Sequence, residues 1–175
     1  MENNSRVYLR ALEPDDYKIS VEWRNDDEIW SMLGGRKYFV SSAYEKKWIE
    51  DTIFNEKDVK LAVCLKENSL YIGNVYLTDI DYVNRSAISH VLIGNKSYWG
   101  NGYAAEAYKL LLSYAFDELG LHRVCAHVLE SNFSSLKMHK SCGYIEEGVL
   151  RDSVWKNGKF QNQVVLSILS HDFKK

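Results

Sequence analysis

The sequence predicts an α/β fold, in which a mixed and mostly antiparallel sheet of six to seven strands carries helices on both of its faces. Candidate strands and helices follow one another along the whole chain. Pairs of strands are joined by short polar turns, which predicts antiparallel hairpins. One strand–helix–strand unit lies between the hairpins, and such a crossover predicts a parallel pair. Both kinds of pairing are therefore expected in one sheet.

The first half of the chain begins with a short strand, continues with helices and ends with a hairpin. The sequence Ser42-Ala43-Tyr44-Glu45 is typical of a capping box that opens a helix. Acidic Asp15 and Asp16 favour the first turn of an earlier helix, because they complement the helix dipole. The expected elements are a strand over 7–11, helices over 15–26, 27–32 and 42–53, and strands over 59–65 and 70–80.

The second half is predicted to contain a central strand, a long helix and a closing hairpin. After the strand Ile88 to Ile93, one stripe of residues repeats at helical spacing. The stripe consists of Ala104, Tyr108, Leu111, Ala115 and Leu119. The remaining expected elements are a strand over 122–129, a helix over 132–142 and strands over 144–155 and 160–169 around Asn157-Gly158. An exposed last strand would allow pairing between subunits in a homodimer.

Length and composition limit the possible classes of protein. With 175 residues and no linker or repeat, the chain is expected to form one domain, residues 1–175. A net charge of −2 without a basic cluster gives no reason to expect nucleic acid as a partner. No apolar run approaches the length of a membrane span, and three cysteines are too few for a disulfide framework. A cytoplasmic protein without membrane contact is therefore expected.

A glycine turn precedes the long helix and suggests a binding site for phosphate. Gly100 and Gly102 permit positive φ and a close approach of a ligand to the backbone. The first N–H groups of a helix have no internal partner, and the helix dipole favours an anion there. The spacing matches neither the phosphate loop of nucleotide triphosphatases nor the dinucleotide-binding motif. The alternative is a helix entry that only needs a tight turn.

This stretch resembles motif A of the GNAT acyl-CoA-dependent N-acetyltransferases, Q/R-x-x-G-x-G/A, with Trp at its first position. Asn132 to Tyr144 resembles motif B of the same family. The sequence Tyr98 to Ala104, of the type Y-W-G-x-G-Y-A, resembles the branch that includes the RimJ and RimL ribosomal-protein acetyltransferases and the spermidine acetyltransferases. The resemblance implies that acetyl-CoA bonds through its pantetheine arm to the backbone of Val91, Leu92 and Ile93. It also implies that the remaining contacts come from Trp99, Gly100, Asn101, Gly102, Tyr103, Ala104, Asn132 and Ser134.

Two histidines are the candidates for proton transfer in this resemblance. His139 stands where many relatives carry the Tyr that protonates or holds the departing thiolate, and imidazole suits that chemistry at neutral pH. In many relatives a Glu of the central strand is the general base that takes the proton from the amine, and Ile88 occupies that position here. His90 lies on the same face of the strand and is the candidate substitute, with water, Glu22 or Asp79 as alternatives.

The acceptor amine is predicted only as a class. The residues Trp23, Arg24 and Asp26 resemble a W-R-N stretch that covers the acceptor cleft of this branch, although Trp23 can equally be core and Arg24 a surface ion pair. A protein N-terminus, a polyamine, an amino sugar or an antibiotic amine would serve as acceptor. The alternative function is a non-catalytic acyl-CoA-binding or regulatory module.

A structural zinc site was the competing interpretation for four residues of the second half. Two thiolates and two imidazoles are a common zinc ligand set, but the spacing of these four residues matches no usual zinc motif. No metal is therefore expected. The four residues are Cys125, His127, His139 and Cys142.

Overall fold

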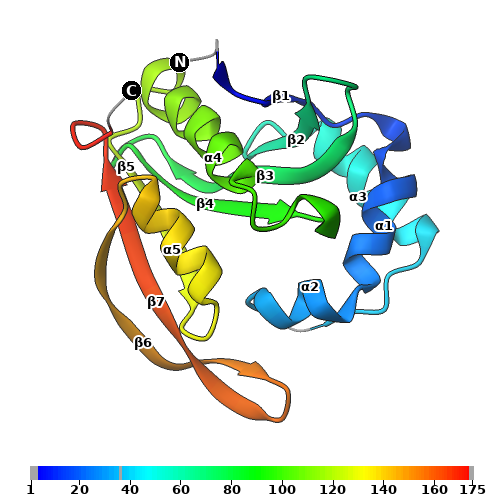
Figure 1. Cartoon of the computed structure of the whole chain (residues 1–175). Helices are drawn as coiled ribbons and strands as arrows, with labels where there is room; N and C mark the ends of the chain where they lie inside the picture. Colours follow the sequence, from blue (N-terminus) through cyan, green and yellow to red (C-terminus); the bar gives the residue numbers. More distant parts are fainter. Residues whose placement is uncertain (1–3, 36, 174–175) are drawn as a thin grey trace.

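The computed structural model describes residues 4–35 and 37–173 and contains one seven-stranded sheet, in the order β1-β2-β3-β4-β5-β7-β6 (Figure 1). The strands are β1 (Val7–Ala11), β2 (Val59–Leu65), β3 (Tyr71–Asp81), β4 (Ser86–Ile93), β5 (Arg123–Leu129), β6 (Ile145–Lys156) and β7 (Lys159–Leu169). The helices are α1 (Tyr17–Asn25), α2 (Asp27–Met32), α3 (Ser42–Ile53), α4 (Tyr103–Ser113) and α5 (Phe133–Ser141). Within the described residues β4 and β5 form the parallel pair, and the other neighbours are antiparallel. The predicted fold class is confirmed.

The parallel pair is short, and this opens the middle of the sheet. Strands β4 and β5 are in register only at Ser86 with Arg123, Ala87 with Val124 and Ile88 with Cys125. Beyond Ile88 strand β4 remains paired with β3 on one side, and β5 remains paired with β7. The two strands therefore diverge into a fork whose inner edges carry backbone groups without a sheet partner. We call this the β4–β5 fork.

Helices cover both faces of the sheet, as predicted. Alternate residues of β2 show this, because Val63 and Leu65 pack into the core under α4, whereas Ala62 and Cys64 pack with the residues of α1 and α3. In Figure 1, α4 crosses in front of the central strands, and α1 and α3 lie together at one end of the molecule. The side chains of β2 are thus divided between two different cores.

Two local details of the helices differ from the prediction. Ser41, not Ser42, caps α3, and its hydroxyl accepts a hydrogen bond from the Tyr44 N–H at 3.1 Å. Glu45 does not complete a capping box, since its carboxylate is fully buried against α1. The long helix expected through Leu119 changes to a π-helical turn at Tyr114–Glu118. The buried stripe of Tyr108, Leu111 and Ala115 continues through this change.

The prediction of an exposed last strand is wrong. Strand β7 lies between β5 and β6, so β6 is the edge strand at this end of the sheet. The error arose because the chain places its last strand inside the sheet and leaves the preceding strand outside. The homodimer stays a prediction and loses this particular support.

None of the helices among the described residues is long and apolar enough to cross a membrane. The cytoplasmic location stays a prediction.

The contact between Gly94 and Trp23 can be tested by mutation. A Cβ atom at Gly94 would overlap the indole of Trp23, which is 7% exposed. Gly94→Ala should therefore lower the free energy of unfolding in urea by about 1–3 kcal/mol. The matched control is Gly148→Ala in β6, where a Cβ atom meets open space. Equal stability of the two variants would contradict the packing described for Trp23.

Candidate active site

The inner edge of β4 offers backbone groups to a ligand. The Gly94 N–H donates to the Ile72 carbonyl at 2.9 Å, and an antiparallel ladder uses every second residue. Leu92 therefore bonds to β3, whereas the backbone groups of Val91 and Ile93 point into the fork. The Trp99 indole N–H donates to the Ile93 carbonyl at 2.6 Å, which agrees with this direction. Val91, Leu92 and Ile93 were predicted to bond the pantetheine arm. Of these, Val91 and Ile93 direct their backbone polar groups into the fork.

The glycine turn has the predicted backbone. Gly100 and Gly102 have φ of 75° and 85°, and Gly102 is the N-cap of α4. No side chain caps this helix start, so the first N–H groups of α4 are available to an anion. The motif residues Trp99, Asn101, Tyr103 and Ala104 complete the turn, with Asn101 exposed.

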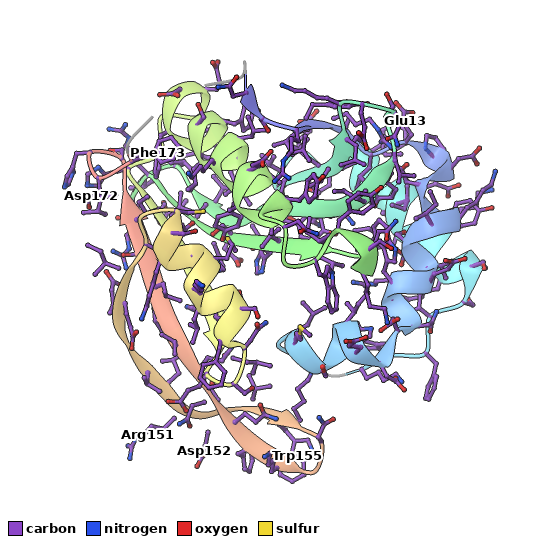
Figure 2. All side chains as sticks on the ribbon, in the orientation of Figure 1. Glu13, Arg151, Asp152, Trp155, Asp172 and Phe173 are labelled. Atoms are coloured by element: carbon purple, nitrogen blue, oxygen red, sulfur yellow. The ribbon has the colours of Figure 1, made fainter. Side chains whose placement is uncertain are left out.

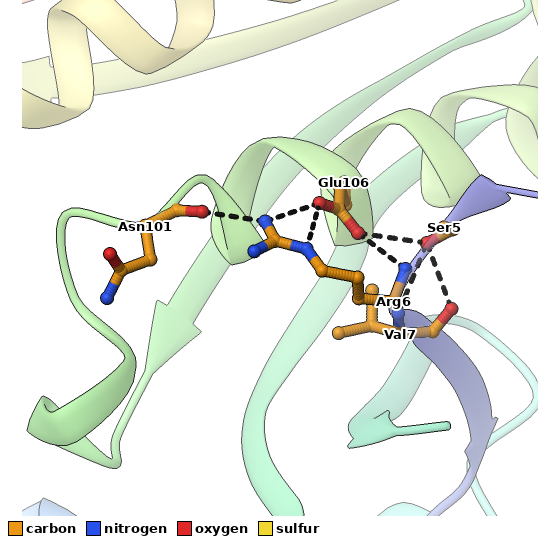
Figure 3. A network of polar contacts seen from close by, with 5 residues as sticks. All are labelled: Ser5, Arg6, Val7, Asn101 and Glu106. Carbon is orange, nitrogen blue, oxygen red and sulfur yellow. Dashed lines mark hydrogen bonds and ion pairs between the residues drawn. The ribbon is translucent and has the colours of Figure 1, made fainter. Parts of the chain in front are cut away.

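Arg6, from just before the edge strand β1, holds the glycine turn in place (Figure 3). Its side chain donates to the Asn101 carbonyl at 2.6 Å, and its Nε donates to Glu106 Oε1 at 2.8 Å. Its backbone N–H reaches the other oxygen of Glu106 at 2.7 Å. The guanidinium also lies 4.0 Å from the centre of the Tyr103 ring. This hydrogen-bonded pair lowers the pKa of Glu106 and fixes the loop between β4 and α4 to the far end of the sheet.

Motif B starts α5 next to α2. The Asn132 side chain caps the helix, because its Oδ1 accepts from the Ser135 N–H at 3.0 Å. Its Nδ2 donates to the Met32 carbonyl at 3.0 Å. Ser134 is exposed in the first turn of the helix. Asn132 thus already uses both ends of its amide, and a ligand would have to replace one of these two bonds.

His139 belongs to a buried polar network at the base of the fork. Its side chain is 3% exposed, and its Nε2 lies 3.0 Å from the hydroxyl of Tyr108. Its Nδ1 lies 2.8 Å from the Ser135 carbonyl, so the neutral ring donates there and accepts from Tyr108. Burial lowers the pKa of His139.

Ser89 joins this network to both strands of the fork. Its hydroxyl donates to the Cys125 carbonyl at 2.9 Å, accepts from the Tyr144 hydroxyl at 2.9 Å and lies against the oxygen of Tyr108, whose own proton points to His139. Burial raises the pKa of Tyr108. This network was not predicted from the sequence. Ser89 lies within a predicted strand, and Tyr108 is part of the apolar stripe that predicts α4, so neither was marked as a polar contact.

His90 lies on the opposite face of β4 from Ser89. Its Nε2 lies 3.0 Å from the hydroxyl of Thr78, and its ring packs near Tyr76 at 6.5 Å between centres. His90 is exposed at the surface, but partial loss of solvation beside Tyr76 and Thr78 lowers the pKa of its ring, and the carboxylate of Asp79 acts in the other direction. At neutral pH the imidazole is therefore uncharged and can accept a proton. His139 and His90 are thus separated by the sheet itself and reach the fork from its two faces.

The three residues predicted for the acceptor cleft have structural contacts. Trp23 packs on Gly94 and on Tyr71, whose ring centre lies 4.8 Å away. Asp26 caps α2 and pairs with Lys96 at 2.8 Å, and this pairing lowers its pKa. For Trp23 the structure favours the core alternative.

Arg24 has structural contacts and is also partly open to solvent. Its Nε lies 3.5 Å from Glu45 Oε2, and neither atom has a hydrogen-bond partner among the described residues. The guanidinium lies between Trp30 and Trp48, at 5.8 Å and 5.4 Å from their ring centres. The side chains of Arg24 and Asp26 are both partly exposed, so these two of the three can still face a ligand, whereas Trp23 is buried.

The four residues of the zinc alternative do not come together. Val124, Ala126 and Val128 point to the core under α4, so Cys125 and His127 point to the opposite face of β5. Cys142 lies in the α4 core, with its thiol on the Ala105 carbonyl. Among the described residues no three His, Cys, Asp or Glu side chains are grouped to hold a metal ion.

Comparison with known proteins now identifies the family. The model of the acetyltransferase (GNAT) domain matches residues 6–145. The chain belongs to the GNAT family. "Probable N-acetyltransferase YjcK" of Bacillus subtilis is 30% identical over 95% of this chain and 95% of its own length. The spermidine N(1)-acetyltransferase of Vibrio cholerae is 29% identical over 97% and 96% of the two chains.

A solved structure supports the same family. The Vibrio cholerae spermidine N-acetyltransferase in complex with CoA and spermine matches with a TM-score of 0.89 and 28% identity, over 97% of this chain and 98% of that one. This GNAT protein is an N-acetyltransferase that uses acetyl-CoA as donor to a primary amine. The fork, the glycine turn and the outward groups of β4 fit such a donor, since they supply free N–H groups for amide and phosphate oxygens.

Proposed function

We propose that the acceptor of this N-acetyltransferase is a linear polyamine, which enters from the face of the sheet that carries His90. The observation that supports this most is the match over nearly the full chain to enzymes named for spermidine. On this face, Asp79 is exposed and forms no ion pair with the described residues, so its carboxylate is available to a second ammonium group. The charge of Arg24 is offset by Glu45.

In this proposal acetyl-CoA binds along the inner edge of β4 and at the start of α4. The backbone of Val91 and Ile93 holds the pantetheine arm, and the N–H groups at Gly102 and the start of α4 hold the diphosphate. Arg6 keeps this turn in position through Asn101 and Glu106. The thioester then lies at the fork, where the two faces of the sheet meet.

His90 takes the proton from the attacking amine in this proposal. The neutral amine attacks the thioester carbon, and its nitrogen becomes positively charged as the new bond forms. His90 then accepts the proton, and the carbon–sulfur bond breaks to give the amide and the thiolate of CoA. The lowered pKa of His90 keeps its ring uncharged for this role at neutral pH.

His139 stabilises the leaving thiolate together with Tyr108. The neutral His139 ring has its proton on Nδ1 toward Ser135, and burial makes Tyr108 a weak acid. Tyr108 is therefore the donor of the pair, and its hydroxyl, once released from His139 Nε2, suits a hydrogen bond to the thiolate better than full proton transfer, which solvent can complete. Both side chains are buried, so contact with the sulfur requires a small rotation of one of them.

The acceptor class is tested with a panel of amines. Spermidine should have a higher kcat/KM than glucosamine or a peptide N-terminus, measured as thiol release from acetyl-CoA. Asp79→Asn should raise the KM for spermidine by up to about fivefold, because a surface charge pair contributes at most about 1 kcal/mol. Asp152→Asn, in the exposed edge strand, is the control. A preference for the peptide would instead favour a protein N-terminus as the acceptor, as in the RimJ and RimL acetyltransferases, and contradict the polyamine.

The role of His90 is tested by the pH dependence of kcat/KM. Attack requires the free amine, whose pKa is about 10, and a neutral His90, whose pKa lies below 6.5. A plot of the logarithm of kcat/KM against pH should rise with a slope of two below the pKa of His90, and with a slope of one between this pKa and that of the amine. His90→Gln should lose the steeper limb and about 10²-fold or more in rate.

His171→Gln, on an exposed residue near the C-terminus, is the control for that series. If His90→Gln keeps both the rate and the steep limb, water or another group is the base.

A further inference from the structure

A bulge in β3 lies beside His90. Between Thr78 and Asp81, strand β3 has one residue more than the facing segment of β4. Asp79 lies in this bulge with a φ of 51°. In a regular strand the side chains of neighbouring residues point to opposite faces, and a bulge with a positive φ breaks this alternation. The side chains of Thr78 and Asp79 are therefore able to meet on the face that carries His90.

Two contacts link Asp79 to His90 through the Thr78 hydroxyl. The Oγ1 atom of Thr78 lies 3.4 Å from Asp79 Oδ2 and 3.0 Å from His90 Nε2. A carboxylate only accepts hydrogen bonds, and a hydroxyl has one proton to donate. Both contacts are hydrogen bonds only when Thr78 donates to Asp79 and accepts from the Nε2–H of His90. The neutral His90 ring then carries its proton on Nε2 and its lone pair on Nδ1.

A second aspartate with positive φ shows that backbone conformation alone does not produce this arrangement. Asp152 has a φ of 49° and also lies at a register shift, between Leu150 and Val154 of β6. Its N–H donates to the Asn162 side chain, but no hydrogen bond joins its carboxylate to another side chain of the described residues. Figure 2 shows Asp152 on the β6–β7 hairpin, at the opposite end of the molecule from the chain termini. The link from carboxylate to imidazole is thus particular to β3 and β4.

Asp79 also differs from the other charged groups that act on His90. Asp58 is the second carboxylate among them, and it pairs with Lys60 at 3.2 Å. His127, on the neighbouring strand β5, opposes a positive charge on His90. Asp79 is therefore the carboxylate of this group without an ion pair among the described residues, and it offsets the charge that His90 acquires with a second proton.

The tautomer matters because a base needs its lone pair on the atom that meets the proton. With the Nε2–H bonded to Thr78, Nδ1 is the ring atom that can accept a proton from the attacking amine. The imidazolium that forms keeps its Nε2–H on Thr78, and Thr78 keeps its proton on Asp79. The carboxylate thus stabilises the charged ring without becoming protonated itself.

We propose that Thr78 and Asp79 are positioning residues, which hold the proton of His90 on Nε2 and leave Nδ1 as the atom that accepts the proton of the amine. This inference rests on the proposed role of His90 as the base. It also assigns two tasks to one carboxylate, since Asp79 Oδ2 serves His90 and Oδ1 remains for the second ammonium group of the acceptor.

The tautomer is tested by NMR of the full chain, from the nitrogen chemical shifts of the His90 ring at about pH 8, where the ring is neutral. His90→Gln assigns the signals. In the unmodified chain the proton should lie on Nε2 in nearly all molecules. Thr78→Val has the same shape without the hydroxyl and should move a measurable share of the proton to Nδ1, whereas Thr78→Ser should restore the original shifts. Thr52→Val, near the end of α3, is the matched control and should leave the His90 shifts unchanged.

Turnover with the preferred amine of the acceptor panel gives the second readout. Thr78→Val should lower kcat about fivefold, because it removes one hydrogen bond to the histidine, and should leave KM for the amine unchanged, because the charge of Asp79 stays. Thr78→Ser should recover the rate.

The proposal is overturned if the proton of the unmodified chain lies on Nδ1, if Thr78→Val leaves the ring shifts unchanged, or if Thr78→Val keeps the original kcat. Failure of the proposed function is recognised separately. Full activity of His90→Gln would refute His90 as the base and proton transfer to its Nδ1, while the ring shifts would still decide whether Thr78 and Asp79 fix the tautomer.

Discussion

The site depends on one constraint, the very short parallel pairing between β4 and β5. Three register pairs hold the strands together, and the Ser89 hydroxyl then bonds to the Cys125 carbonyl where the strands begin to separate. A buried carbonyl without a partner would destabilise such an opening. Ser89 therefore gives the Cys125 carbonyl a partner at the base of the fork, while the outward groups of β4 beyond it stay available to a ligand.

The alternation of β4 then divides the residues of the proposed mechanism between two faces. Ser89 points to α4 and α5, where it meets Tyr108 and the network of His139. His90 points to the face covered by α1 and α3, close to Tyr76 and Asp79. In the proposed mechanism, donor and acceptor therefore approach one carbon atom from the two faces of the sheet, at the fork where β4 and β5 separate.

Much of this arrangement could be predicted from the sequence, because it rests on local signals. Period-two alternation placed His90 with Ile88, and the glycines predicted the helix entry that Gly102 forms. Contacts between distant residues could not be predicted in this way. Arg6 lies about a hundred residues from Glu106, and nothing local marks either as a partner. Ser41 and Ser42 are equally good caps in sequence, and Glu45 was drawn to α1 by Ser20 and Arg24. The position of β7 inside the sheet likewise depends on pairing across the fold.

Hydrogen exchange at the inner edge of β4 tests the central claim most directly. The amides of Val91 and Ile93 point into the fork, whereas that of Leu92 already bonds to β3. Saturating acetyl-CoA should slow exchange at Val91 or Ile93 at least about tenfold and leave Leu92 nearly unchanged. Unchanged exchange at both outward amides, with acetyl-CoA bound, would show that the fork is not where the donor lies.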